Sequence, residues 1–359
     1  MSTIFDDAPQ HGGTHGPRPL PLFLAMLRSE TAADPARLTR ALAGLRAYQD
    51  APREAPMPTM PAVAQAGRAT LRDYGGSGRP VVFVPSLINP PGILDLSAET
   101  SLLRWLATQG MRPLLVDWGT LGAEDRDLDL TDHVETLLVP LLLSLSEPPV
   151  LVGYCLGGTL AVAAAARTPV AALVSIAAPW HFSGYGVQSQ AAMAAMWAAA
   201  APVSAALGML PIEVLQAGFW QLDPARTIAK YAAFGAMPPE GAAARAFVRL
   251  EDWANTGAPL PHAAARTLFE ECIAQDSPGA GRWPVGDAIV DPMRLGCPAI
   301  EFVSLTDRIV PAATAIGLPE RRDLALGHVG MIVGTRARTA LWHPLAAWIG
   351  THAARNPFW

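Results

Sequence analysis

The chain has 359 residues, of which 51% are hydrophobic and 16% are charged, and its formal net charge is −5. A chain of this length and composition can bury at least one large core. The net negative charge argues against nucleic acid as a partner, because phosphate binding needs a basic surface. Three cysteines in so long a chain make no disulfide framework and are typical of the reducing cytosol.

Residues 1–61 are predicted to form a tail, a helix and a proline-rich linker. The first residues are acidic where a signal peptide would be basic, so we expect no signal peptide. Residues 1–20 are rich in Gly, Pro and His, which is typical of a disordered tail. Asp34 and Pro35 have the residue types of an N-cap and a first turn, and they predict an amphipathic helix through Tyr48.

Apolar runs alternate with helical patterns in residues 62–180, and again in residues 291–359. The runs predict buried strands at 80–84, 114–117, 150–153, 171–177, 298–304 and 323–326. Helical patterns stand at 97–109, 131–145, 156–167 and 337–353. This alternation predicts an α/β fold with a mostly parallel sheet and helices on both faces.

The alternation is interrupted by residues 181–290, which are rich in Ala and Pro and are predicted to form a helical cap. The stretch from Ala191 to Ile212 carries no charge, but it is mostly alanine and is broken by prolines. We therefore expect a buried or interfacial helix pair there and no transmembrane span. The tryptophans of this segment either pack against the core or form the apolar face of a mobile lid over the active site. They are Trp197, Trp220, Trp253 and Trp283.

The segment from Gly153 to Gly157 has the pattern G-x-Nuc-x-G, with Cys155 as the nucleophile. It follows a predicted strand and precedes a predicted helix, as the nucleophile elbow of α/β hydrolases requires. We expect a strained turn in which side chains at Gly153 or Gly157 would collide with backbone. Unpaired N–H groups at the helix start favour the thiolate, and the N–H of Leu156 can receive an oxyanion. The alternative is a small apolar cysteine packed in the turn.

The acid and the base of such a site follow the nucleophile in that order. Asp307 stands directly after a predicted strand, where the alternative role is to form a turn. His328 stands on a glycine-flanked loop, where it has little packing reason to be. The other histidines show no metal-ligand spacing beside a third ligand, so no metal is expected. They are His11, His15, His133, His181, His262, His343 and His352.

With these motifs the chain resembles the poly(3-hydroxyalkanoate) synthases, especially the short type that works with a partner subunit. The matching segments are 85–89, 93–96, 101–106, 116–119, 153–157, 307–311, 327–330 and 342–348. The likeness covers about residues 80–180 and 290–350. The cap departs from the family: Gln221 stands where the family has Asn, and residues 230–235 do not match the segment expected there.

The resemblance implies an α/β-hydrolase fold with a cap and an acyltransferase that polymerises 3-hydroxyacyl-CoA through a thioester on Cys155. It implies that His328 takes the thiol proton and that Asp307 orients His328 or helps it to deprotonate the incoming 3-hydroxyl. The N–H of Ile88 is expected to be the second oxyanion donor. Acyl-CoA is the substrate and no cofactor is expected.

The resemblance also implies partners and a location. The expected partners are the growing polyester chain or granule surface, and a second copy of the chain or a second synthase subunit. The expected location is the cytoplasm, at polymer granules. Two alternatives stay open: a thioesterase, esterase or depolymerase on the same scaffold, and a non-catalytic granule-associated paralogue.

Overall fold

The computed structural model describes residues 15–352, and its contacts divide the chain into two compact units. The helical unit consists of Met1–Glu54 and Asp223–Asn255, and the sheet unit consists of Ala55–Leu222 and Thr256–Trp359. In this division, residues 223–255 of the predicted cap group with the N-terminal helices. Residues 1–14 of the predicted tail lie outside the described residues.

The helical unit contains α1 (Leu20–Glu30), α2 (Pro35–Asp50), α9 (Pro224–Phe234) and α10 (Ala242–Ala254). Asp34 caps α2 as predicted, since its carboxylate accepts the N–H of Arg37 at 2.9 Å, whereas α1 was not predicted. Helices α2 and α9 cross closely: a Cβ on Gly44 would lie 1.8 Å from the carbonyl oxygen of Tyr231. The ring of Tyr231 packs edge-on against that of Tyr48 at 5.8 Å. Segments far apart in the sequence therefore share one core.

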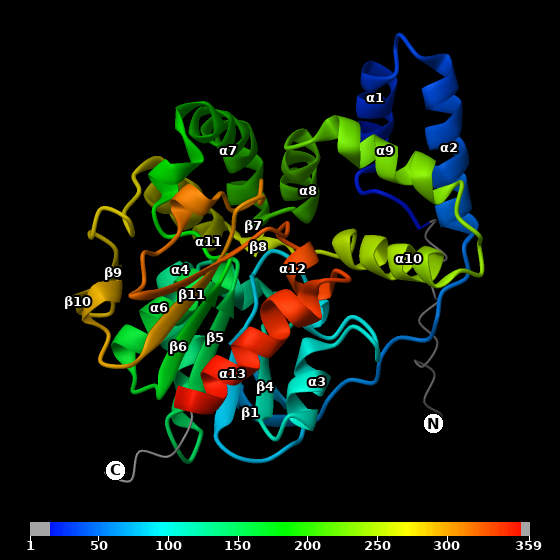
Figure 1. Cartoon of the computed structure of the whole chain (residues 1–359). Helices are drawn as coiled ribbons and strands as arrows, with labels where there is room; N and C mark the ends of the chain where they lie inside the picture. Colours follow the sequence, from blue (N-terminus) through cyan, green and yellow to red (C-terminus); the bar gives the residue numbers. More distant parts are fainter. Residues whose placement is uncertain (1–14, 353–359) are drawn as a thin grey trace, which may run out of the picture. The chain divides into compact units, whose positions relative to one another are not determined.

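The sheet unit is built on eight strands in the order β1-β2-β4-β3-β5-β6-β11-β12 (Figure 1). The strands are β1 (Ala62–Ala66), β2 (Ala69–Asp73), β3 (Pro80–Val84), β4 (Arg112–Asp117), β5 (Val150–Tyr154), β6 (Ala172–Ile176), β11 (Ala299–Ser304) and β12 (Glu320–Leu324). The pairs β1–β2 and β2–β4 are antiparallel, and the other neighbours are parallel. Every residue of β3, β5 and β6 is buried, as expected of strands covered on both faces.

Helices cover both faces of this sheet, which confirms the predicted α/β class. Helices α3 (Leu102–Thr108) and α13 (His343–His352) lie on one face, and α4 (Leu130–Asp132), α5 (Val139–Leu143) and α6 (Leu156–Arg167) lie on the other (Figure 1). The short helix α12 (Gly330–Val333) precedes α13. The carboxyl ends of β3, β5, β6 and β11 meet at one edge, and the loops that follow them can converge there.

The rest of the predicted cap is mainly helical, as expected. It contains α7 (Val187–Leu207), α8 (Ile212–Gln221), α11 (His262–Arg266) and the two-residue strands β7 (Met209–Leu210), β8 (Leu260–Pro261), β9 (Pro284–Val285) and β10 (Ala288–Ile289). The π-helical turn Thr267–Ala274 continues α11.

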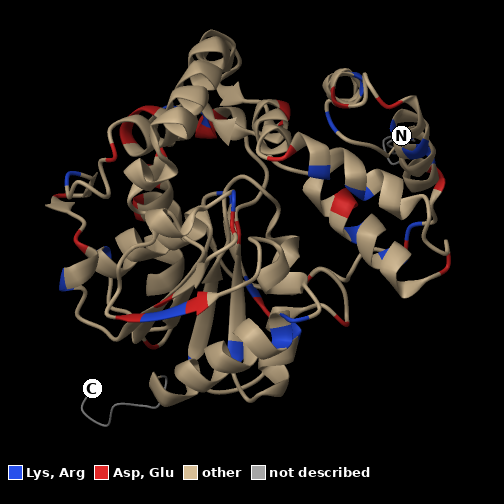
Figure 2. Cartoon of the chain, turned by 45° about the horizontal axis from the view of Figure 1, so that its top comes forward, with Lys and Arg blue, Asp and Glu red and all other residues tan. Residues whose placement is uncertain are grey.

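Helix α7 corrects the expectation of a helix pair, because residues 187–207 form a single helix with Pro202 inside it. The helix ends at Gly208, whose φ of 73° few other residues adopt easily. No Lys, Arg, Asp or Glu interrupts it (Figure 2). Among the described residues it alone is long and apolar enough to cross a membrane by length and composition, and only 11% of its apolar window is buried.

The tryptophans of the predicted cap are mostly packing residues. The ring of Trp197 stacks on that of Phe269 at 5.4 Å, and its indole N–H donates to Glu270 at 2.8 Å. Trp283 is fully buried and meets Trp180 edge to face at 6.0 Å. Trp220 is also buried, whereas Trp253 is half-buried. Three of the four tryptophans are therefore buried, as expected of residues that pack against the core.

Candidate active site

Cys155 lies between β5 and α6 in the strained turn that the sequence predicts. Its φ is 57° and its ψ is −136°, and its N–H donates to the carbonyl of Ile176 at 3.0 Å. A Cβ on Gly153 would lie 2.3 Å from the Cα of Gly158. A Cβ on Gly157 would lie 2.1 Å from the carbonyl oxygen of Val84. Only glycine fits at 153 and 157 without backbone movement, so these residues hold the thiol above the carboxyl edge of the sheet.

His328 and Asp307 are brought together by the loops that follow β12 and β11. The Nδ1 of His328 lies 2.5 Å from Oδ2 of Asp307, and both side chains are buried. The other carboxylate oxygen of Asp307 accepts the N–H groups of Ile309 at 2.7 Å and Val310 at 3.0 Å. The backbone thus fixes the carboxylate, and the carboxylate fixes the imidazole.

Cys155 lies near this pair, since its charge acts on the pKa of His328. Burial lowers the pKa of His328, but the charge on Cys155, the charge on Asp307 and the hydrogen bonds to both raise it, to about 10. The imidazole therefore holds a proton as long as Cys155 carries a negative charge. An imidazolium beside a thiolate is the arrangement that activates a cysteine nucleophile.

Tyr154 is a part of this site that the sequence argument missed. Its ring stacks on the imidazole of His328 at 5.0 Å, and its hydroxyl donates to the carbonyl oxygen of His328 at 3.2 Å. This buried tyrosine therefore holds both the ring and the backbone of the histidine in place. Its position in the sequence could have indicated this role, since Tyr154 stands directly before the nucleophile, at a variable position of the elbow motif.

The two predicted oxyanion donors differ in their present hydrogen bonding. Leu156 is the first residue of α6, where N–H groups have no partner within the helix. The N–H of Ile88 instead donates to the hydroxyl of Ser86 at 3.2 Å. The loop itself lies beside the elbow, because a Cβ on Gly157 would meet the carbonyl of Pro85 at 2.5 Å. Ile88 stays a predicted donor, and that role requires Ser86 to release its N–H.

The remaining cysteines and two of the other histidines have structural surroundings. Burial raises the pKa of Cys272 strongly and that of Cys297 to about 11, so both thiols are poor nucleophiles. His133 is fully buried, and burial is the main reason why its pKa falls to about 4. His262 hydrogen-bonds Ser204 at 3.0 Å. Within residues 15–352, no group of three His, Cys, Asp or Glu side chains could hold a metal ion.

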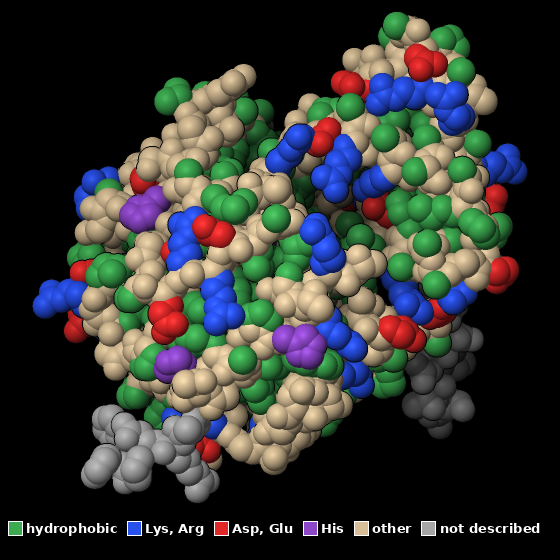
Figure 3. All heavy atoms as spheres, in the orientation of Figure 1, with side chains coloured by type: hydrophobic (Ala, Val, Ile, Leu, Met, Phe, Trp, Pro, Cys, Tyr) green, Lys and Arg blue, Asp and Glu red, His purple; other side chains and the backbone are tan. Residues whose placement is uncertain are grey.

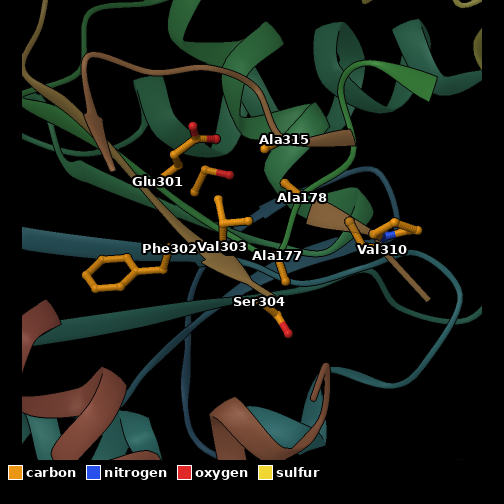
Figure 4. Close-up of a pocket in the computed structure, with 10 residues that line it drawn as sticks. Ala177, Ala178, Glu301, Phe302, Val303, Ser304, Val310 and Ala315 are labelled. Atoms are coloured by element: carbon orange, nitrogen blue, oxygen red, sulfur yellow. The ribbon is translucent and has the colours of Figure 1, made fainter. Parts of the chain in front are cut away.

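A small cavity lies between β6 and β11, near the loop that carries Asp307 (Figure 4). Its volume is about 10 Å³, which is room for about one water molecule and far too little for an acyl chain. The buried Glu301 at this cavity accepts the N–H groups of Ile316 at 2.9 Å and Gly317 at 3.1 Å. Its role is therefore to anchor the segment after the Asp307 loop.

Comparison with known proteins gives a consistent set of relatives in sequence. The chain is 28% identical over 285 residues to the poly(3-hydroxyalkanoate) polymerase subunit PhaC of Haloferax mediterranei, which covers 75% of this chain and 58% of that protein. The proteins of the same name from Synechocystis and Allochromatium vinosum are 28% and 24% identical, and the match covers 75% of this chain and 77% and 80% of those proteins. No family model matches the chain.

Comparison with solved structures gives the fold. An esterase from Thermogutta terrifontis superposes with a TM-score of 0.50 at 16% identity, over 84% of this chain and all of that one. The α/β hydrolase GrgF from Penicillium gives 0.51 at 19% identity, over 83% of this chain and all of that one. These likenesses concern the fold alone. The chain thus has the α/β-hydrolase fold and, as its motifs predicted, is related in sequence to the poly(3-hydroxyalkanoate) polymerase subunits.

Proposed function

We propose that the chain is an acyltransferase that polymerises 3-hydroxyacyl-CoA into polyhydroxyalkanoate and releases CoA. The observation that supports this proposal is the hydrogen-bonded pair of His328 and Asp307, with Cys155 in the strained elbow close enough to act on the pKa of His328. The names of the relatives support polymerisation as the reaction. The match spans 58% of the length of the Haloferax mediterranei protein and 63% of the length of the protein of the same name from Haloarcula marismortui. The activity of the whole relatives is therefore part of the proposal.

The choice of a thiol supports transfer over hydrolysis. A serine would suffice to hydrolyse an ester, whereas acylation of Cys155 gives a thioester nearly equal in energy to the acyl-CoA thioester. Loading from CoA is therefore reversible and nearly neutral in free energy. Passing the acyl group to a hydroxyl makes a more stable oxygen ester, so the second step runs downhill.

In the loading step, the thiolate of Cys155 attacks the thioester carbonyl of acyl-CoA. The C–S bond to Cys155 forms, and the bond to the sulfur of CoA breaks. The imidazolium of His328 gives its proton to the departing CoA thiolate, so His328 becomes neutral. The N–H of Leu156 stabilises the oxyanion of the intermediate.

Loading itself then prepares His328 for the second step. The charge on Cys155 is the largest cause that raises the pKa of His328, and acylation removes that charge. The pKa of His328 should fall in the acyl-enzyme, so the neutral imidazole can take the proton of an incoming 3-hydroxyl group. Asp307 keeps the imidazole oriented while this alkoxide attacks and the thiolate of Cys155 leaves.

The experiment that tests this function is incubation of the full chain with 3-hydroxybutyryl-CoA, with free CoA, soluble 3-hydroxybutyrate and insoluble polymer measured together. Release of CoA with polymer is the expected result. Release of CoA with free acid would replace the proposal by a thioesterase. If neither appears, with or without added polymer granules, the proposed activity fails and the non-catalytic alternative gains support.

The same proposal places the protein in the cytoplasm at the surface of polymer granules, since its product is a water-insoluble polyester. A fluorescent fusion of the full chain should therefore form foci that coincide with stained polymer in producing cells. A fusion that stays diffuse while polymer accumulates would contradict this location.

A further inference from the structure

Tyr185 lies on a short turn that is clamped beside the proposed acid. It is the last residue of the 3₁₀ turn Phe182–Tyr185, between β6 and α7. The N–H of Trp180 donates to the carbonyl of Thr314 at 2.7 Å, and a Cβ on Gly184 would lie 2.3 Å from the carbonyl oxygen of Ala313. The backbone of the turn thus packs directly on the backbone of the segment that follows Asp307. This packing fixes the position of the Tyr185 backbone.

The ring of Tyr185 is half-buried, and its hydroxyl has no hydrogen-bond partner. The ring packs near Phe182, with the centroids 6.1 Å apart. In residues 15–352 no group hydrogen-bonds the phenol oxygen. Burial first, and then the charges on Cys155 and Asp307, raise the pKa of Tyr185. Because the turn packs on the segment after Asp307 and β6 lies between β5 and β11, Tyr185 lies at the same edge of the sheet as Cys155 and Asp307. Its phenol stays protonated and can donate a hydrogen bond.

The order of the strands places this donor on one side of the thiol. Strand β5, which carries Cys155, has β3 on one side and β6 followed by β11 on the other. The loop of Ile88 follows β3, whereas Tyr185 follows β6 and Asp307 follows β11. Tyr185 is thus on the side of the base, away from the predicted second oxyanion donor. The acceptor hydroxyl must also approach on the base side, because His328 takes its proton.

We propose that the phenol of Tyr185 donates a hydrogen bond to the oxygen of the acceptor's 3-hydroxyl group as that group approaches the acyl-enzyme. The inference rests on the proposed function. In this step the acceptor O–H gives its proton to His328, a C–O ester bond forms, the C–S bond breaks, and Cys155 leaves as a thiolate. Water is a smaller acceptor that His328 can place without this contact, so Tyr185 favours transfer over hydrolysis.

The test separates loading from transfer. Butyryl-CoA loads a butyryl group that has no hydroxyl and cannot extend itself, and the burst of CoA measures this loading. 3-Hydroxybutyryl-CoA is then added as the acceptor, and mass spectrometry measures butyryl-3-hydroxybutyryl-CoA against butyrate. In Tyr185→Phe we expect loading within about twofold of the parent and an ester-to-butyrate ratio about tenfold lower, the effect of one lost hydrogen bond.

Tyr74→Phe is the matched control. Tyr74 belongs to the same unit, but its ring lies under the guanidinium of Arg104, 5.6 Å from the ring centroid, and its N–H bonds the carbonyl of Pro113 near the start of β4. The ester-to-butyrate ratio of Tyr74→Phe should equal that of the parent. An unchanged ratio in Tyr185→Phe, or an equal fall in loading and transfer, would overturn the role of Tyr185. A parent protein that loads butyryl groups but yields only butyrate would instead overturn the proposed transferase.

Discussion

Helices α6 and α7 are both rich in alanine, yet the fold uses them in opposite ways. Every residue of α6 from Leu156 to Ala164 is buried, because the helix begins at the elbow and packs directly on the sheet. In α7 only Trp197 and Ser204 are buried, and Val187, Val203 and Leu207 are largely exposed. The surface over α7 carries no charged side chain (Figure 3). Small residues therefore allow close approach in α6 and leave an uncharged outer face in α7.

The largest expected effect lies at the start of α6. Cys155→Ala should abolish CoA release while leaving the fold intact, because alanine has nearly the same shape and the turn tolerates a Cβ at this position. Intact-mass analysis after incubation with acyl-CoA should show no adduct. The controls are Cys272→Ala and Cys297→Ala, which should keep most activity. If either control were inactive while Cys155→Ala still worked, another thiol would be the nucleophile.

The next effect concerns the two residues that serve this thiol. His328→Gln and Asp307→Asn should each lower kcat/KM for CoA release at least about a hundredfold, within the usual range for general acid–base groups. His328 should matter more, since it moves the proton whereas Asp307 mainly positions it. His262→Gln serves as the control, because that side chain bonds Ser204 and stacks on Trp197, both on α7. An equally inactive His262→Gln beside an active His328→Gln would show that the histidine was wrongly chosen.

The electrostatic coupling at this edge can be measured directly. An NMR titration of His328 should give a pKa near 10 in the parent, and Cys155→Ala should move it toward the ordinary value of 6.5, because the largest raising cause is gone. The folded pKa lies above the unfolded one, so the stabilisation is fully present below pH 6.5 and is lost as pH rises through about 10. An equal pKa in both proteins would exclude the coupling that the proposed mechanism uses.

The smallest expected effects come from making the same substitution, Ala to Leu, in each of the two helices. Ala161→Leu in α6 should lower the free energy of unfolding by about 1–3 kcal/mol, because Ala161 is fully buried and the core has no room for three more carbons. Ala198→Leu on the exposed face of α7 should change it by less than about 0.5 kcal/mol. Denaturant unfolding of both variants measures the difference. Equal losses would mean that the outer face of α7 is covered in solution.

The elbow and most of the sheet could be predicted because they depend on local physics. Gly153 and Gly157 indicate a turn that has no room for a side chain at either position, and Asp34 indicates the start of a helix. The central strands are continuous apolar runs because both of their faces are covered. The edge strand β12 was predicted at 323–326 but spans Glu320–Leu324, since its exposed residues Glu320–Asp323 carry charge and give no apolar signal.

The sequence by itself determined the elbow turn around Cys155 and the class of the fold, because a strand, a glycine turn and a helix leave a local pattern. Only the tertiary structure decided where the predicted cap divides, that α7 is one mostly exposed helix, and that the ring of Tyr154 stacks on that of His328. These features depend on contacts between distant segments, such as Gly44 against Tyr231 or Gly184 against Ala313. Neither partner of such a contact carries a local signal, because the contact exists only after the backbone has brought the two together.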